Sequence, residues 1–153
     1  MLKIVIGISL IVVCTLIGKQ KAQKLKNEYL YFSDLRAFCK SFEGNLQYGK
    51  KEIESYLNES YLSNDFNNTL NSFISNNSLY IPSFLNVKEK SDVISFFSEL
   101  GVSDSVSQLT SIKSFYNVFL EYEKDKNEVF KKYYSAYMKI GFSIGFMLML
   151  VVI

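Results

Sequence analysis

The two ends of this chain are apolar, and nearly all of its charge lies between them. Residues 4–17 read IVIGISLIVVCTLI and residues 140–153 read IGFSIGFMLMLVVI, and neither run holds a charged side chain. Every acidic residue, and every lysine or arginine except Lys3, lies between Lys19 and Lys139. Exposing such runs to water is unfavourable by several kcal/mol each. The pattern therefore predicts a membrane protein with two anchors and a polar middle.

The apolar runs divide the chain into three predicted parts. A transmembrane helix is expected over residues 2–18 and another over residues 139–153, and between them lies a polar domain over residues 19–138. About 120 residues are enough for one compact domain and too few for two.

The first apolar run is also compatible with a cleaved signal peptide, with Lys3 as its basic leading segment. No small-x-small cleavage site follows the run, and lysines come directly after it at positions 19, 21, 24 and 26. A lipoprotein signal would use Cys14, but Val13 stands where a small residue is required. The sequence therefore favours a retained anchor, with a cleaved leader as the alternative.

Both apolar runs are short for a transmembrane helix. Fourteen residues span about 21 Å of α-helix, against a hydrocarbon core of about 30 Å. Flanking lysines can snorkel, and close packing of the two helices through small residues would also help. The candidate small residues are Gly7, Gly18, Gly141 and Gly145. Gly141 and Gly145 have the GxxxG spacing, but glycine is also ordinary in membrane helices, so the sequence leaves their packing role open.

Lysines flank each apolar run on the side that faces the central domain. Four follow the first run before any acidic residue, and five precede the second: Lys124, Lys126, Lys131, Lys132 and Lys139. On the opposite side of the two runs, the only lysine is Lys3. Because basic flanks stay on the cytoplasmic side of a membrane, we expect the central domain in the cytoplasm and both termini on the opposite side.

The central domain is predicted to be all-α. Apolar residues recur there at steps of three and four, without sustained strand alternation. One such stripe follows the first run: Leu25, Tyr29, Phe32, Leu35, Cys39, Phe42 and Leu46. We expect this helix to run from the membrane to Tyr48, with Gly49 as its stop. Shorter helices are expected over residues 52–57, 65–74 and 87–100, the last between Pro82 and Gly101.

A final helix is expected to begin near Ser105 and to continue into the membrane as one rod. Ser105 and Gln108 fit a capping box, and no proline or glycine follows until Gly141. The apolar stripe lapses within a charge run at residues 121–128, which we interpret as a solvated face. The predicted architecture is a helical bundle between two membrane-anchoring terminal helices, with the long helices continuing from membrane into domain.

The chain carries little of what catalysis requires. It contains no histidine, which is the commonest general base and the commonest metal ligand. Cys14 and Cys39 lie too far apart on one helix to form a disulfide. Glu121 and Glu123 are i,i+2 neighbours and do not face each other on a helix. A net charge of +2 also argues against nucleic acid as a partner. We therefore predict a protein that is not an enzyme and has no cofactor, metal or nucleic-acid partner.

Three patches of the chain form a recognisable order: residues 14–18 (CTLIG), residues 35–49 (with LR, then FEGNLQYG) and residues 96–108 (FFSELGVSD, then Gln108). Together they resemble the stage III sporulation protein AB family of endospore-forming bacteria. The family also ends, as this chain does, in a long helix that runs into a terminal anchor. The chain differs from the family pattern at Asn45 and at Phe97, where the family has Glu and Gly.

This family is similar to the membrane platform proteins of type II secretion systems and type IV pili. The resemblance implies a non-enzymatic platform or assembly subunit of a channel complex in spore formation. It would lie in the mother-cell or outer forespore membrane, where it would dock a secretion-type motor ATPase or neighbouring subunits, with self-association possible. The positions expected to carry structure or partner contacts are Arg36, Glu43, Tyr48, Gly49, Leu100, Gly101, Asp104 and Gln108.

A second functional class is compatible with the same residues. An exported helical protein that acts on a membrane or binds a partner would have its first run cleaved and its last run inserted. The missing cleavage site and the lysine flanks argue against it, and the accessibility of the central domain from outside the cell discriminates between the two.

Overall fold

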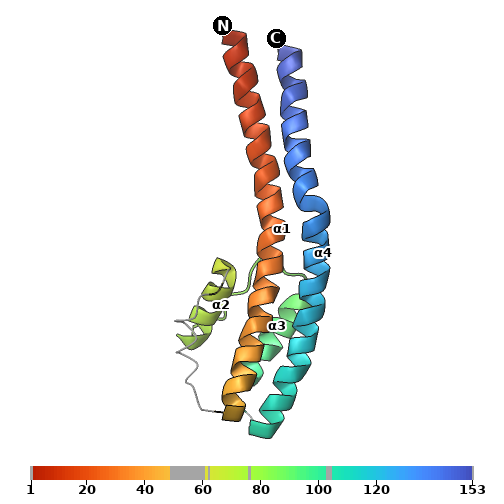
Figure 1. Cartoon of the computed structure of the whole chain (residues 1–153). Coiled ribbons are helices and arrows are strands. Elements are labelled where there is room, and N and C mark those ends of the chain that lie inside the picture. The colour runs from red at the N-terminus through yellow and green to blue at the C-terminus, as the bar shows by residue number, and fades with distance from the viewer. Residues whose placement is uncertain (1, 49–60, 62, 76, 103–104, 153) are drawn as a thin grey trace. The chain divides into compact units, whose positions relative to one another are not determined.

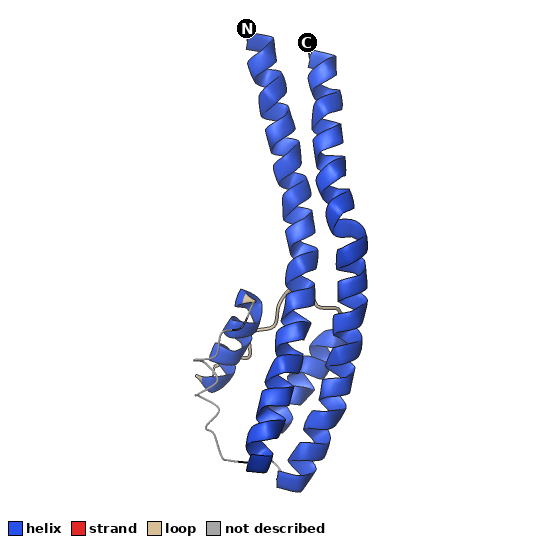
Figure 2. Ribbon diagram, in the orientation of Figure 1, coloured by secondary structure: helices blue, strands red, loops and turns tan. Residues whose placement is uncertain are grey.

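A computed structural model describes residues 2–48, 61, 63–75, 77–102 and 105–152, and this part of the chain is helical without any strand (Figures 1 and 2). The helices are α1 (Leu2–Tyr48), α2 (Asn64–Ile74), α3 (Val87–Glu99) and α4 (Ser105–Val152). The predicted all-α bundle with long terminal helices is thus confirmed. The helix expected over residues 52–57 and the stop at Gly49 lie outside the described residues.

The chain divides into two compact units. The helix-pair unit comprises Met1–Tyr29 and Asp125–Ile153, and the four-helix unit comprises Leu30–Lys124. Because α1 and α4 are each unbroken, both helices contribute residues to both units. Within the helix-pair unit, α1 and α4 run antiparallel and bring the two chain ends to the same end of the pair (Figure 1).

The core of the four-helix unit is built mainly from aromatic side chains. The predicted stripe of α1 is confirmed here, since Phe32, Leu35, Cys39 and Phe42 are all buried. Tyr31 and Phe38 are fully buried as well, although they lie outside that stripe. Phe38 packs on Phe42, Phe66, Phe96 and Phe97, with ring centroids 5.8–6.4 Å apart. The α1 helix therefore buries two faces, because it is packed on more than one side.

Buried polar groups tie α1 to α2. The carboxylate of Asp34, which is 3% exposed, accepts a hydrogen bond of 2.8 Å from the backbone N–H of Ser63. Ser63 is the N-cap of α2, and its hydroxyl accepts from the N–H of Phe66 at 3.2 Å. One turn into α2, the Thr69 hydroxyl lies 3.2 Å from the Tyr31 hydroxyl. These bonds satisfy groups that would be costly to bury alone.

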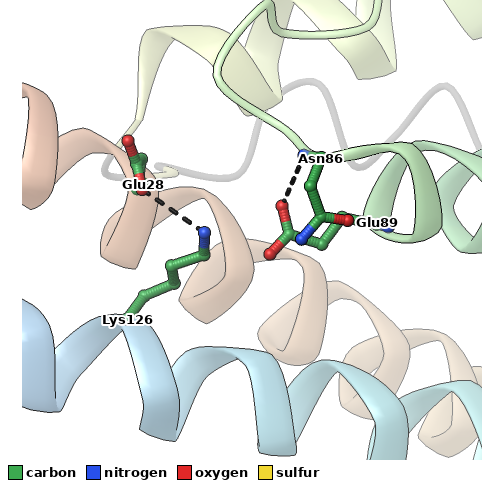
Figure 3. A network of polar contacts seen from close by, with 4 residues as sticks. All are labelled: Glu28, Asn86, Glu89 and Lys126. Atoms are coloured by element: carbon green, nitrogen blue, oxygen red, sulfur yellow. Dashed lines mark hydrogen bonds and ion pairs between the residues drawn. The ribbon is translucent and has the colours of Figure 1, made fainter.

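The α3 helix has nearly the predicted span and ends at the predicted glycine, and its start is closed by a capping box that was not predicted. At its start, the Asn86 side chain accepts from the N–H of Glu89, and the Glu89 carboxylate accepts from the N–H of Asn86, both at 2.9 Å (Figure 3). This capping box satisfies N–H groups at the helix start that would otherwise lack a partner. At its end, Gly101 takes a φ of 81°, a left-handed conformation that favours glycine. Gly101 is therefore a helix stop.

Candidate functional site

The most unusual feature of the helix-pair unit is the contact between its two backbones. A Cβ atom added to Gly18 would lie 2.6 Å from the carbonyl oxygen of Tyr137 and 3.3 Å from the Cα of Gly141. A Cβ atom on Gly141 would lie 2.7 Å from the carbonyl oxygen of Cys14. Backbone atoms cannot move aside as a flexible side chain can. Glycine is therefore required at both positions for this packing.

The GxxxG spacing of α4 has the same role. A Cβ atom on Gly145 would lie 2.7 Å from the Cα of Ile11, so its neighbour is again backbone. Gly18, Gly141 and Gly145 together form what we call the glycine seam. The sequence left their packing role open, and the structure assigns it. Gly7 differs, because its close neighbour is the flexible Met149 side chain at 2.7 Å.

Away from the glycine seam, the apolar segments are exposed. Val12, Val13 and Ile17 of α1 are 52–54% exposed, and Met147 and Leu150 of α4 are 68% and 63% exposed. Both α1 and α4 are long and apolar enough to cross a membrane. Helices that meet through small residues while directing large apolar side chains outward have the packing typical of membrane helices. This surface favours association of the unit with a membrane.

A band of lysine and tyrosine side chains borders the apolar segment of each helix, after it in α1 and before it in α4. On α1 it contains Lys19, Lys21, Lys24 and Lys26, and on α4 it contains Lys131, Lys132, Tyr133, Tyr134, Tyr137 and Lys139. These three tyrosines are 36–40% exposed. Tyrosine and lysine are the residues that anchor a helix at a membrane surface.

Two further contacts hold α1 and α4 together within the helix-pair unit. Lys126 Nζ lies 3.4 Å from Glu28 Oε2 (Figure 3). The rings of Tyr29 and Phe130 stack with centroids 5.8 Å apart. The Lys126 ion pair corrects our interpretation of the charge run at residues 121–128, which is not a uniformly solvated face.

A second correction to that interpretation lies in the four-helix unit. Glu123 is only 9% exposed, and its carboxylate forms an ion pair with Arg36 Nε and accepts from Nη2 at 3.3 Å. The Tyr116 hydroxyl lies 3.5 Å from Arg36 Nη1. The apolar stripe of α4 is interrupted at Glu123 because this position faces the Arg36 guanidinium on α1. A carboxylate therefore stands there in place of an apolar side chain.

Glu43 lies seven residues after Arg36 on α1, and both side chains pair with residues of α4. Their partners differ, since Glu43 lies 3.6 Å from Lys113 Nζ. This pair is more open to solvent, with side chains 29% and 55% exposed. Glu43 and Lys113 therefore stabilise little and leave charge at the surface.

Leu100 and Gln108, two of the other predicted positions, come together at the end of α3. They lie beside Phe96 and Ile112 in a packed region without room for a water molecule, and both are 7% exposed. The Gln108 amide nitrogen has no hydrogen-bond partner among the described residues. Tyr48 is the last residue of α1, while Gly49 and Asp104 lie outside the described residues. The expected Ser105–Gln108 capping box also involves a side chain that is not described.

Sequence reasoning missed a hollow that lies between α2 and α3. Phe73, Leu79, Ile94 and Phe97 line it, together with Asn77 and Ser98. Ile94 is 49% exposed on α3, so the hollow is open and apolar. Phe97, where the resembled family has Gly, forms part of its wall. Phe97 was visible as a departure from the family pattern, but its pairing with α2 depends on a loop conformation that no local pattern specifies.

The chemistry of the titratable groups is that of a packed core. Burial raises the pKa of the Cys39 thiol well above its usual range, so the thiol stays protonated and unreactive. Burial, together with the hydrogen bond to Asp92 at 2.6 Å, also raises the pKa of Tyr122. Among the described residues, no three His, Cys, Asp or Glu side chains are placed to hold a metal ion.

No protein family, curated protein or solved structure matches this chain.

Proposed function

We propose that this protein is a non-enzymatic membrane platform subunit of a secretion-like channel complex that acts in endospore formation. One observation carries the proposal. A glycine seam joins two helices whose large apolar side chains face outward, and the same two helices continue into an aromatic-packed four-helix unit. Such a chain is suited to hold a folded domain at a membrane, where other subunits assemble on it. The resemblance to the stage III sporulation protein AB family supplies the cellular setting.

The proposed topology has the four-helix unit in the cytoplasm and both termini outside, in the mother-cell or outer forespore membrane. The band of lysines on the domain side of the apolar segments supports this orientation. A motor ATPase is cytoplasmic, so only this orientation allows the four-helix unit to dock one.

The proposed docking surface is the end of the four-helix unit where α3 ends and α4 begins. Leu100 and Gln108 are buried there and pack beneath the surface. Val102 is 80% exposed and forms part of the surface itself. The solvent-exposed Glu43–Lys113 pair adds charge of both signs. An apolar contact with a charged rim is the usual composition of a protein interface.

The orientation is tested by cysteine labelling in intact cells. Cys39 is fully buried and cannot report topology, so the reporter is Ser91→Cys, at an exposed position of α3, in a Cys14→Ser background. A membrane-impermeant maleimide should label this cysteine only after permeabilisation. Labelling in intact cells would reverse the topology and favour the exported helical protein.

The assembly role is tested by photocrosslinking in sporulating cells of the native host. A photoreactive residue at Val102 should capture the motor ATPase or a neighbouring channel subunit, identified by mass spectrometry. Val87, 86% exposed at the other end of α3, is the matched control and should capture neither. Equal crosslinking at both positions, or none from Val102 to a channel component, would contradict the proposal.

A further inference from the structure

The helix-pair unit contains a hollow that the anchoring role does not require. It lies between α1 and α4 and has a volume of about 270 Å³. Its lining includes Gly18 and Gly141 and the apolar side chains of Ile17, Ile140 and Ile144. The hollow lies beside the close backbone contact of Gly18 and Gly141. In a membrane it would open toward the lipid tails, since Ile17, Ile140 and Ile144 are each about half exposed.

Two of the residues that line the hollow carry a polar group, and both lie on the same side of the glycines along the helices. Lys21 and Tyr137 line it, and each lies about one helical turn from the glycines, on the side toward the four-helix unit. Lys21 is exposed and makes no ion pair or hydrogen bond with any other described residue. An apolar slot bordered by a lysine and a tyrosine matches the polarity of a phospholipid, with an acyl chain in the slot and an anionic headgroup near these two side chains.

The charge of the whole unit favours an anionic ligand. The helix-pair unit carries nine lysines against three acidic residues. One of those acidic residues, Glu28, is already paired with Lys126 at 3.4 Å. Juxtamembrane lysines attract anionic lipids, and each contributes about fivefold to their binding.

We propose that the hollow between α1 and α4 is a binding site for one anionic phospholipid. One acyl chain lies over Gly18 and Gly141 between the isoleucines. The phosphate contacts the Lys21 ammonium group and accepts a hydrogen bond from the Tyr137 hydroxyl. Lys24 and the other lysines of the band add a general attraction, whereas the hollow selects one molecule. The bound chain would also fill space beside the glycine seam and stabilise the helix pair.

The test uses the full chain in nanodiscs of phosphatidylcholine with one third phosphatidylglycerol, extracted into mild detergent for native mass spectrometry. The wild-type chain should retain one phosphatidylglycerol molecule preferentially. Lys21→Gln should reduce this retention about fivefold or more. Lys131→Gln removes the same charge from the band outside the hollow and should change it little.

A second pair of variants tests the hollow without altering charge. Ile144→Trp places a large ring at its wall and should abolish preferential retention. Leu148→Trp, at a position 42% exposed outside the hollow, should retain the lipid. Soluble glycerol phosphate should not compete, because it has no chain to occupy the slot. Competition by glycerol phosphate, equal losses in the two lysine variants, or full retention by Ile144→Trp would each overturn the proposal.

The inference rests on the membrane insertion proposed above and not on the assembly role. The two failures are distinguishable. A chain that does not insert would be missing from the nanodisc fraction, whereas a chain that inserts without selecting phosphatidylglycerol would refute only the lipid site. Unchanged helical circular dichroism would show that each variant has folded.

Discussion

Arg36 and Glu123, which are 87 positions apart in the chain, form a two-contact ion pair between α1 and α4 in the four-helix unit. The Tyr116 hydroxyl accepts a hydrogen bond from the same guanidinium. A carboxylate with a side chain only 11% exposed needs such partners, because an unpaired buried charge is strongly unfavourable. The pair therefore specifies how the two helices align in this unit.

Removing the carboxylate of this pair should destabilise the protein. Glu123→Ala is expected to lower the free energy of unfolding by about 1–3 kcal/mol. The lower part of that range is favoured by the Arg36 side chain, which is 32% exposed and so remains partly solvated. The measurement is thermal or denaturant unfolding of the detergent-solubilised chain, followed by circular dichroism.

Glu121→Ala is the matched control, since it removes an exposed carboxylate two residues away and should change stability by less than about 0.5 kcal/mol. The double variant Arg36→Met, Glu123→Leu should regain part of the lost stability, because it leaves no charge unpaired. A similar loss in Glu121→Ala and Glu123→Ala would show that the ion pair contributes nothing specific.

The glycine seam should not tolerate larger side chains. Gly141→Leu would force the helices apart, because even its Cβ would lie 2.7 Å from the carbonyl oxygen of Cys14. We expect the free energy of unfolding to fall by about 1–3 kcal/mol or more, as is typical of overpacking. Gly7→Ala is the milder control, because the Met149 side chain can move aside.

Pairing of the helices can be measured by disulfide formation between cysteines introduced at Gly7 and Met149, in a Cys14→Ser background. A Cβ atom on Gly7 would lie 3.5 Å from the Cβ of Met149, a separation that a disulfide can bridge. Crosslinking of this pair should fall sharply when Gly141→Leu is added. It should persist with Phe142→Leu, at a neighbouring position that is 54% exposed. If both substitutions leave crosslinking unchanged, the seam does not hold the pair together.

Truncating the central aromatic side chain of the core should be among the most damaging single changes. Phe38 is fully buried and contacts four other rings. Phe38→Ala is expected to reduce the free energy of unfolding by about 3–5 kcal/mol. Phe142→Ala, at a position 54% exposed, removes the same atoms from an exposed site and should have a much smaller effect in detergent. Thermal unfolding of both variants tests this, and equal losses would contradict the assigned core.

Stability should fall at alkaline pH. Burial raises the pKa of Tyr31 and of Tyr122 above the ordinary value of 10.0, so the folded state keeps both phenols protonated when the unfolded chain begins to ionise. Their contribution is therefore complete below about pH 10 and is lost progressively as the pH rises above it. The melting temperature should decline between about pH 9.5 and 11, and this decline should be shallower in Tyr122→Phe. An identical slope in that variant would exclude the effect.

The thiol of Cys39 should be protected in the folded protein. It is fully buried, and burial raises its pKa, so little thiolate forms at neutral pH. In a Cys14→Ser background, maleimide labelling should be at least about 100-fold slower for the folded than for the denatured chain, because it requires opening of the core. Rapid labelling of the folded chain would show that this part of α1 is not packed as described.

Much of the helical architecture could be predicted from periodicity and end signals. The spans of α2 and α3 follow local patterns, because caps and turns are set by neighbouring residues: Ser63 and Asn86 at the starts, and Gly101 at the end of α3. The second buried face of α1 was not predicted. Residue type does not distinguish Tyr31 and Phe38, which are buried, from the exposed tyrosines of α4. Their burial depends on the helices that pack against them.

The sequence by itself determined that the chain has two apolar ends, a helical middle and a basic band beside the apolar segments, because composition and periodicity are local properties. The tertiary structure decided which glycines meet backbone, which residues of the charge run find partners, and where a hollow lies beside the glycine seam. These features depend on the register between α1 and α4. Register is set by the packing of residues more than a hundred positions apart, such as Gly18 and Gly141, and no local pattern encodes it.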